Sequence, residues 1–169
     1  MFDGNKYIIF ICTGNSCRSP MAEGIARKIF DKYDLPIEVD SFGTLDIGGT
    51  SPSKLVQRVC EKNGIDISAH KAQMLNRKAA EKADVILTME NAHIFWISEY
   101  LGSDVAQKAI LLTNYGKERN GGEESIEIPD PLGRALDFHE IVFDMLESEI
   151  ERIAKYERSN RTDINYGSS

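Results

Sequence analysis

The stretch KYIIFICTGNSCRSPMAEG, residues 6–24, sets the architecture of this chain. Its first part, Lys6 to Ile11, is an almost unbroken apolar run, which is typical of a central parallel strand buried on both faces. Apolar residues then recur at helical spacing from Met21 to Tyr33, with Ser19 as the expected N-cap and Pro20 at the first helical position. The order strand, turn, helix predicts the first unit of an α/β sheet.

The rest of the chain repeats this alternation. Short apolar segments predict three more strands, and helical periodicity predicts the elements between and after them. The strands are expected at 37–41 (near a sheet edge), 84–89 and 109–112, and the helices from about 51 to 62, 75–83, 92–101 and 138–153. We therefore expect an α/β three-layer sandwich, in which a parallel sheet of four strands has helices on both faces.

Length and charge limit the kinds of protein that the chain can be. Its 169 residues suffice for one compact domain, and its net charge of −7 argues against binding to nucleic acid or to a membrane surface. No apolar stretch approaches the roughly 18 residues that cross a bilayer, and the first residues lack a signal-peptide pattern, so a cytoplasmic location is expected. From Arg158 the sequence is poor in apolar residues, so we expect a single domain over 1–157 and a mobile tail over 158–169.

The cysteines and histidines divide into candidates for chemistry and candidates for structure. Three cysteines are an odd number, and their spacing matches neither a disulfide framework nor a zinc site, so free thiols are expected. Cys60 lies on the apolar face of a predicted helix and is expected in the core. The histidines are scattered singly, which favours surface or helix-capping roles; they are His70, His93 and His139.

Two segments break the alternation of strands and helices. The first is the turn of residues 12–19, and the second is the aperiodic stretch Thr113 to Gly133, which contains the run IPDPLG. A loop as long as the second segment, about 20 residues, is usually functional or disordered when it occurs in a compact domain. Both segments follow the carboxyl end of a predicted strand, where open α/β sheets place their ligand crevice.

The first turn has the composition of an anion-binding loop with a nucleophile. A loop that wraps onto a helix N-terminus presents unpaired N–H groups, which bind phosphate. The lysine of a nucleoside-triphosphate loop and the spaced glycines of a dinucleotide fingerprint are missing from GNSCRS. Cys12 stands at the start of the turn, where N–H groups and Arg18 favour a thiolate, and Arg18 can hold two oxygens of one phosphoryl group.

These residues resemble a known family. Cys12 to Pro20, CTGNSCRSP, followed by Met-Ala-Glu directly after the first strand, looks like the active-site loop of the low-molecular-weight protein tyrosine phosphatases. Asp130-Pro131 resembles that family's general acid and its proline, and Ser41 to Thr44 resembles its Ser-Ala-Gly-Thr segment, with Phe42 in place of a small residue. The resemblance covers residues 6–157 and implies the strand order 2-1-3-4.

The resemblance implies a division of labour among the loop residues. Cys12 would attack phosphorus, Arg18 would bind the phosphoryl oxygens, and Asp130 would protonate the leaving group and then activate water. Ser19 would hydrogen-bond the thiolate, Asn15 would hold the strained backbone, and Cys17 matches a cysteine that can form a reversible disulfide with the nucleophile. The phosphate-binding loop is completed by Thr13, Gly14 and Ser16. The family implies no metal and no cofactor, a phosphorylated protein as substrate, and phosphate as product.

The substrate pocket departs from the pattern of phosphotyrosine-specific members, which have aromatic walls. At the positions of these two walls the chain has the segment LDIGG (45–49), which contains Ile47, and Leu132. Together with Ser16 of the loop, Ile47 and Leu132 are the candidate pocket residues. At Ser16 the chain is similar to the family's protein-arginine phosphatase branch, which has threonine at this position. A small hydroxyl residue admits a guanidinium-bearing substrate that a branched aliphatic residue would exclude. Phosphotyrosine is the first expectation and phosphoarginine the alternative. Two other functions fit the sequence less well. An arsenate reductase would need two further cysteines downstream, which this chain lacks. A module that binds phosphate without turnover would have no use for the acid Asp130.

Overall fold

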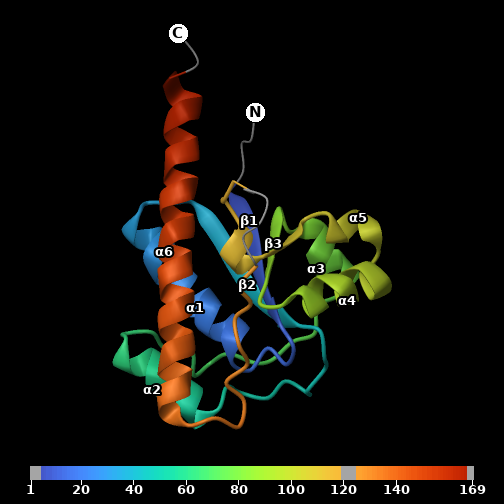
Figure 1. Cartoon of the computed structure of the whole chain (residues 1–169), viewed down its shortest axis with the longest axis vertical. Helices are drawn as coiled ribbons and strands as arrows, with labels where there is room; N and C mark the ends of the chain where they lie inside the picture. Colours follow the sequence, from blue (N-terminus) through green and yellow to red (C-terminus); the bar gives the residue numbers. More distant parts are fainter. Residues whose placement is uncertain (1–4, 119–124, 167–169) are drawn as a thin grey trace.

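The sheet at the centre of the molecule has four parallel strands in the predicted order. The computed structural model describes residues 5–118 and 125–166, and for 162–166 it describes the backbone alone. The strands are β1 (Lys6–Cys12), β2 (Ile37–Gly43), β3 (Val85–Thr88) and β4 (Ala109–Leu111), in the order β2-β1-β3-β4, with every neighbouring pair parallel (Figure 1). β2 therefore lies at an edge, as its half-polar sequence predicts.

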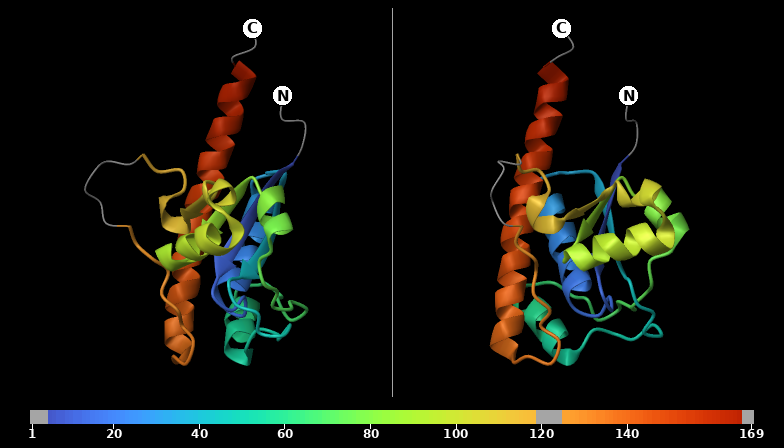
Figure 2. Two further views of the ribbon diagram at one scale, coloured as in Figure 1. Left: turned by 90° about the vertical axis from the view of Figure 1, so that its right-hand side faces the viewer. Right: turned by 45° about the vertical axis from the view of Figure 1, so that its right-hand side comes forward.

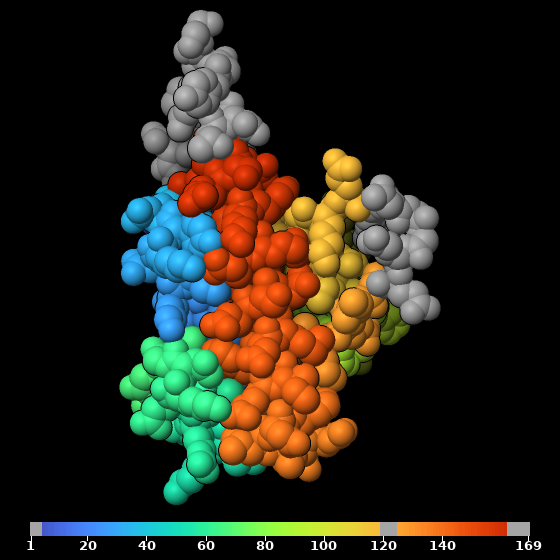
Figure 3. Space-filling model, turned by 60° about the vertical axis from the view of Figure 1, so that its left-hand side comes forward, coloured from blue at the N-terminus to red at the C-terminus, as the bar shows by residue number. Residues whose placement is uncertain are grey.

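Helices cover both faces of the sheet. The helices are α1 (Arg18–Lys32), α2 (Lys54–Lys62), α3 (Arg77–Lys82), α4 (Asn91–Leu101), α5 (Ser103–Ala106), the 3-10 turn η1 (Leu112–Asn114) and α6 (Leu136–Tyr166). α1, α2 and α6 pack on one face, and α3, α4 and α5 lie on the other (Figures 1 and 2). Figure 3 shows α6 running along one side of the molecule, with α2 against its first turns. The expected three-layer sandwich is confirmed.

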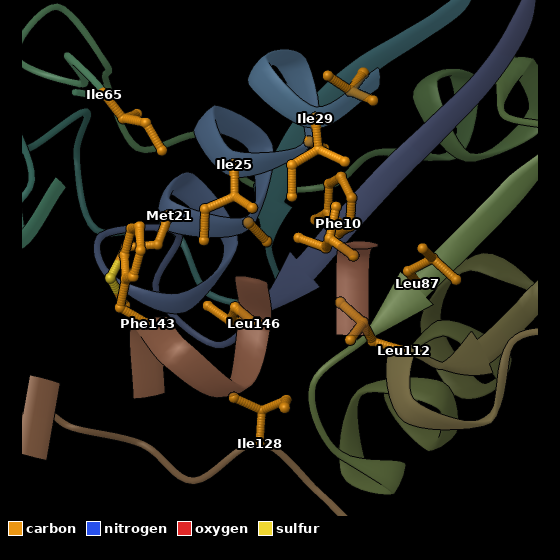
Figure 4. Packing of buried hydrophobic residues seen from close by; sticks show 14 of the residues in the cluster. Phe10, Met21, Ile25, Ile29, Ile65, Leu87, Leu112, Ile128, Phe143 and Leu146 are labelled. Carbon is orange, nitrogen blue, oxygen red and sulfur yellow. The ribbon is translucent and has the colours of Figure 1, made fainter. Parts of the chain in front are cut away.

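Strand β1 connects the two cores because its side chains alternate between the faces. Ile8 and Phe10 belong to the core beneath α1 and α6, whereas Ile9 and Ile11 belong to the core beneath α3, α4 and α5. All four side chains are fully buried, which explains why the sequence shows a continuous apolar run instead of alternation. The larger core extends to the loop before α6, where Ile128 packs in the same cluster as Leu146 (Figure 4).

Several local predictions are wrong at the ends and faces of helices. α1 begins at Arg18, with Cys17 as N-cap, so Ser19 lies inside the helix. Leu55 and Ile141, which the periodicity places on buried faces, are both exposed. The short helix α5 was not predicted, because four residues carry no periodicity.

Helix α6 is longer than the composition predicts and is tied to the rest of the fold by buried polar groups. It continues through Tyr166, beyond Arg158, and the side chains of residues 158–160 are exposed. Glu157, the residue directly before them, is buried and accepts hydrogen bonds from Lys6 Nζ and from the Tyr115 hydroxyl, each at 2.6 Å. The boundary at residue 157 and the mobility of the tail stay predictions. Within the described ranges, none of the helices combines the length and the apolar character that a membrane crossing requires.

Candidate active site

The loop between β1 and α1 surrounds the sulfur of Cys12 with hydrogen-bond donors. The Asn15 backbone N–H donates to Cys12 Sγ at 3.2 Å, and Ser19 Oγ lies 2.9 Å from the same sulfur. Asn15 has a φ of 52°, a left-handed conformation that asparagine tolerates better than most residues, and this turn aims its N–H at the sulfur. Cys12 itself is buried at the carboxyl end of β1, where the crevice of a parallel sheet is expected.

The side chain of Asn15 fixes the loop from inside. Its amide nitrogen donates to Ser19 Oγ and to Ser41 Oγ, both at 2.9 Å, and its oxygen accepts from the Gln73 backbone N–H at 2.9 Å. His70 Nε2 lies 3.1 Å from the same side-chain oxygen. Ser19 Oγ accepts from Asn15, so its own hydrogen has two acceptors within reach, the sulfur at 2.9 Å and the Phe42 carbonyl oxygen at 3.3 Å. A buried amide satisfied on both sides makes the loop rigid before any ligand arrives.

The end of β2 packs directly against the loop because Gly43 has no side chain. A Cβ at Gly43 would lie 2.6 Å from the carbonyl oxygen of Thr13 and 3.0 Å from the backbone nitrogen of Asn15. The next two residues continue the contact, since Thr44 N donates to Cys12 O at 3.1 Å and Leu45 N donates to Thr13 O at 3.0 Å. This explains why the Ser-Phe-Gly-Thr segment has glycine at its third position.

Arg18 is held in place by partners from two other segments of the chain. Its side chain is only 2% exposed. Nη1 pairs with the Glu90 carboxylate and donates to the Ile128 carbonyl oxygen at 2.9 Å, while Nη2 lies 3.3 Å from Asp130 Oδ2. These contacts fix the plane of the guanidinium beside the loop.

Asp130 reaches Arg18 because the loop in front of it is anchored. Ile128 is fully buried, and its backbone N–H donates to the Met89 carbonyl oxygen at 2.9 Å. Asp130 Oδ1 accepts from the Leu132 backbone N–H at 3.1 Å, an Asx-type turn that orients the carboxylate. The two irregular segments predicted from the sequence therefore meet at one place: Cys12, Arg18 and Asp130 belong to a single site.

Two of the three pocket candidates lie close to Gly14 of the loop. A Cβ at Gly14 would lie 3.5 Å from Ser16 Oγ and 3.6 Å from Ile47 Cδ1, so a hydroxyl and an aliphatic group flank this position. Leu132 is 76% exposed on the loop that follows Asp130. The three candidates therefore present one hydroxyl and two aliphatic side chains.

Comparisons with known proteins agree with this geometry. The model of the family described as low molecular weight phosphotyrosine protein phosphatase matches residues 7–162. The chain belongs to this family. It is 31% identical to a protein-arginine-phosphatase of Bacillus subtilis (91% of this chain, 98% of the relative) and 30% identical to the low molecular weight protein-tyrosine-phosphatase Etp of Escherichia coli K12 (88% and 92%). A solved structure of the YwlE arginine phosphatase with a phosphorylated active-site serine superimposes with a TM-score of 0.83 at 27% identity, over 92% of this chain and 98% of that one.

Membership confirms the predicted family, the strand order and the class of cysteine-based phosphatase. The relatives named above divide between tyrosine and arginine, so similarity alone does not choose the substrate of this phosphatase. The individual roles of the loop residues stay predictions, although the structure brings those residues together.

The phosphatase has two thiols besides Cys12, and both are buried. All three cysteines lie in the described part of the chain, and each is a free thiol. Burial, with the nearby Cys12 as a smaller cause, raises the pKa of the Cys17 thiol far above its ordinary value. Burial raises the pKa of Cys60 to about 12, and its side chain lies in the core, as predicted.

The sequence interpretation missed the residues that support Arg18 and the loop from outside. Glu90 and His93 follow β3, and His93 was expected to have a surface or capping role. It does cap α4, in a reciprocal capping box with Glu90, but its ring also contacts Thr13 of the phosphatase loop. His70, similarly, supports Asn15. One available signal was position, because Glu90 directly follows the carboxyl end of a central strand.

Proposed function

We propose that this phosphatase hydrolyses phosphotyrosine in proteins through a phosphocysteine intermediate. The observation that carries the proposal is the meeting of three groups: Cys12 at the end of β1, Arg18 behind it, and Asp130 with its carboxylate 3.3 Å from Arg18 Nη2. The first group is a nucleophile, the second binds an oxyanion, and the third can move a proton. A molecule that only binds phosphate would use the second alone.

The proposed chemistry has two steps. The Cys12 thiolate attacks phosphorus and the bond to the substrate oxygen breaks, while Asp130 gives that oxygen its proton and Arg18 binds the phosphoryl oxygens. Water then attacks the phosphocysteine, Asp130 takes a proton from the water, the P–S bond breaks and phosphate leaves. Dividing hydrolysis in this way replaces one difficult displacement by two easier ones.

A flat aromatic substrate stays the first candidate because aliphatic side chains can take the place of the aromatic walls of phosphotyrosine-specific members. Ile47 and the exposed Leu132 and Leu45 offer aliphatic surface near the loop, and an aromatic leaving group can lie against such side chains. Phosphoarginine is the second candidate, and Ser16 is the observation that favours it. A small hydroxyl at this position leaves room for the polar guanidinium, whereas a branched aliphatic side chain would exclude it.

Phosphate release from matched phosphotyrosine and phosphoarginine peptides tests both candidates, with Cys12→Ser as the blank. We expect turnover by the wild type, none by the blank, and a loss of about 10²–10⁴-fold in Asp130→Ala. Ser16→Ile should lower the rate on phosphoarginine and spare phosphotyrosine. Faster release from phosphoarginine by the wild type would reverse the order of the candidates. Release from neither peptide, with phosphate still bound, would leave a binding module.

A further inference from the structure

The ring of His93 lies between the phosphate-binding loop and the N-terminus of α4. His93 is 3% exposed, and its Nε2 lies 3.0 Å from Thr13 Oγ1, next to the nucleophile in the chain. Its Nδ1 accepts a hydrogen bond from the Glu90 backbone N–H at 3.1 Å. A helix-capping role needs the second contact only, so the contact with Thr13 requires a separate explanation.

The hydrogen bonds determine the protonation of the ring. A backbone N–H can only donate, so Nδ1 must be the unprotonated nitrogen, and in the neutral ring Nε2 carries the hydrogen. His93 therefore donates to Thr13 Oγ1. The direction of this bond leaves the hydroxyl hydrogen of Thr13 free for an acceptor on its exposed side.

Glu90 connects His93 to the guanidinium that binds phosphate. The Glu90 side chain accepts from the His93 backbone N–H, which completes the capping box, and it also pairs with Arg18 Nη1. The contact with the Glu90 carboxylate uses the His93 backbone, so only the hydrogen bond from the Glu90 backbone N–H to Nδ1 depends on the ring. Replacing the ring would release the backbone of Glu90, from which the carboxylate that pairs with Arg18 extends.

We propose that His93 is a positioning residue of the phosphatase reaction, a neutral imidazole that fixes Thr13 of the loop and, through Glu90, the orientation of Arg18. The inference rests on the proposed function, since it concerns the same site. It names a residue that acts through two others and touches neither the phosphoryl group nor the leaving group.

The charges around the ring are consistent with a neutral imidazole. Arg18 from α1 faces it, as do the acidic groups of Glu90, Glu127 and Asp130. Burial first, and then the charge of Arg18, lower the pKa of His93 to about 4, and the three carboxylates oppose this shift only in part. The ring therefore keeps Nδ1 as an acceptor at neutral pH.

The test compares His93→Leu with His93→Gln, using p-nitrophenyl phosphate as substrate and inorganic phosphate as competitive ligand. Leucine removes both ring contacts, so we expect kcat/KM to fall at least about tenfold and phosphate to bind correspondingly more weakly. Glutamine can accept from the Glu90 N–H and donate to Thr13, so it should restore most of both quantities. The matched control is His139→Leu, because His139 is also 3% exposed near the start of a helix, where its Nδ1 lies 2.9 Å from the Ala135 carbonyl oxygen.

The outcomes separate this inference from the proposed function. A wild type that is no more active than Cys12→Ser would contradict the proposed function, whereas an active wild type with unchanged kcat/KM in His93→Leu would contradict the inference. Equal loss of thermal stability in His93→Leu and His139→Leu, without a kinetic difference, would reduce His93 to a helix cap. If His93→Leu does not fold, Thr13→Val is the deciding variant. It removes the hydrogen bond between His93 Nε2 and Thr13 Oγ1 at an exposed position. Unchanged phosphate affinity and kcat/KM in this variant would overturn the proposal.

Discussion

Arg18 shows, at the level of single residues, how the site is prepared before substrate binds. A guanidinium that is 2% exposed would be costly without partners, and it has Glu90, Asp130 and the Ile128 carbonyl oxygen. Its two carboxylate partners are themselves 29% and 44% exposed, so they neutralise the cation from the open side. Because folding already fixes the orientation of the Arg18 guanidinium, no free energy is needed to reorient it during the reaction.

The titration of His93 leads to a prediction about stability and pH. Its pKa is lowered to about 4 in the folded protein, against about 6.5 for an unfolded histidine. Between these values the unfolded chain binds a proton at His93 that the folded protein does not. The contribution of this group to the free energy of unfolding is therefore fully present above about pH 6.5 and is lost as the pH falls toward 4.

His93→Gln removes this titration and so provides the measurement. Urea unfolding of both proteins at intervals from pH 7 to pH 4 should show the wild type losing more stability than the variant, by up to about 3 kcal/mol. Parallel losses in the two proteins would mean that the imidazole is already protonated in the fold.

At the level of elements, the approach of β2 to the loop predicts the effect of a single methyl group. Gly43→Ala would place Cβ 2.6 Å from the Thr13 carbonyl oxygen. The Cβ is attached directly to the backbone of β2 and the oxygen belongs to the backbone of the loop, so neither can move aside as a flexible side chain would. We expect a loss of about 1–3 kcal/mol in stability and at least about a tenfold fall in kcat/KM as the loop is displaced.

Gly24→Ala is the matched control for that substitution. Its Cβ would also meet an atom at 2.6 Å, but that atom is a side-chain methyl of Ile65, away from the loop. Thermal unfolding and p-nitrophenyl phosphate kinetics on both variants should show a kinetic defect for Gly43→Ala alone. A fully active Gly43→Ala would mean that the loop tolerates movement of β2.

Local pattern predicted what depends on neighbouring residues, and the family resemblance brought Asp130 to the loop, but the distant residues that support Arg18 were missed. The β1 strand and the turn that follows it were predicted from local pattern and propensity. Arg18 and Glu90, in contrast, are separated by 72 positions and meet only when β1 and β3 pair. The wrong N-cap at Ser19 has a local cause: the loop winds into the helix, so Met21 N donates to Cys17 O and the first turn begins earlier than serine and proline predict.

The attachment of α6 gives a second prediction at this level. The Tyr115 hydroxyl donates to Glu157 at 2.6 Å and accepts from Lys6 Nζ at 2.7 Å, so it joins η1, β1 and α6. Tyr115→Phe should lower the free energy of unfolding by about 1–2 kcal/mol, because the buried Glu157 and the half-buried Lys6 each lose a hydrogen bond. Tyr100→Phe, at a tyrosine that is 72% exposed, should change it by less than about 0.5 kcal/mol. Equal effects in chemical denaturation would show that the three groups do not act as an anchor.

For the whole molecule, the arrangement of the two cores explains where the domain should end. Every layer that positions the site is complete by Glu157, the last side chain of the anchor between α6 and β1. The side chains of residues 158–160 are exposed although the helix continues, so they contribute little burial.

A chain that ends at Arg158 should therefore keep the fold and the activity of the full protein. Arg158 is retained because its guanidinium lies 5.1 Å from the ring centre of Tyr33, a contact between α6 and the end of α1. We expect the melting temperature to change by no more than about 2 °C and kcat/KM to be unchanged, since all the site groups among the described residues precede residue 157. The control is a chain that ends at Lys155, which loses Glu157 and leaves Lys6 and Tyr115 without their common acceptor, so it should melt well below both. If the chain ending at Arg158 instead lost stability as the shorter one does, the last turns of α6 would belong to the domain and the boundary at residue 157 would be wrong.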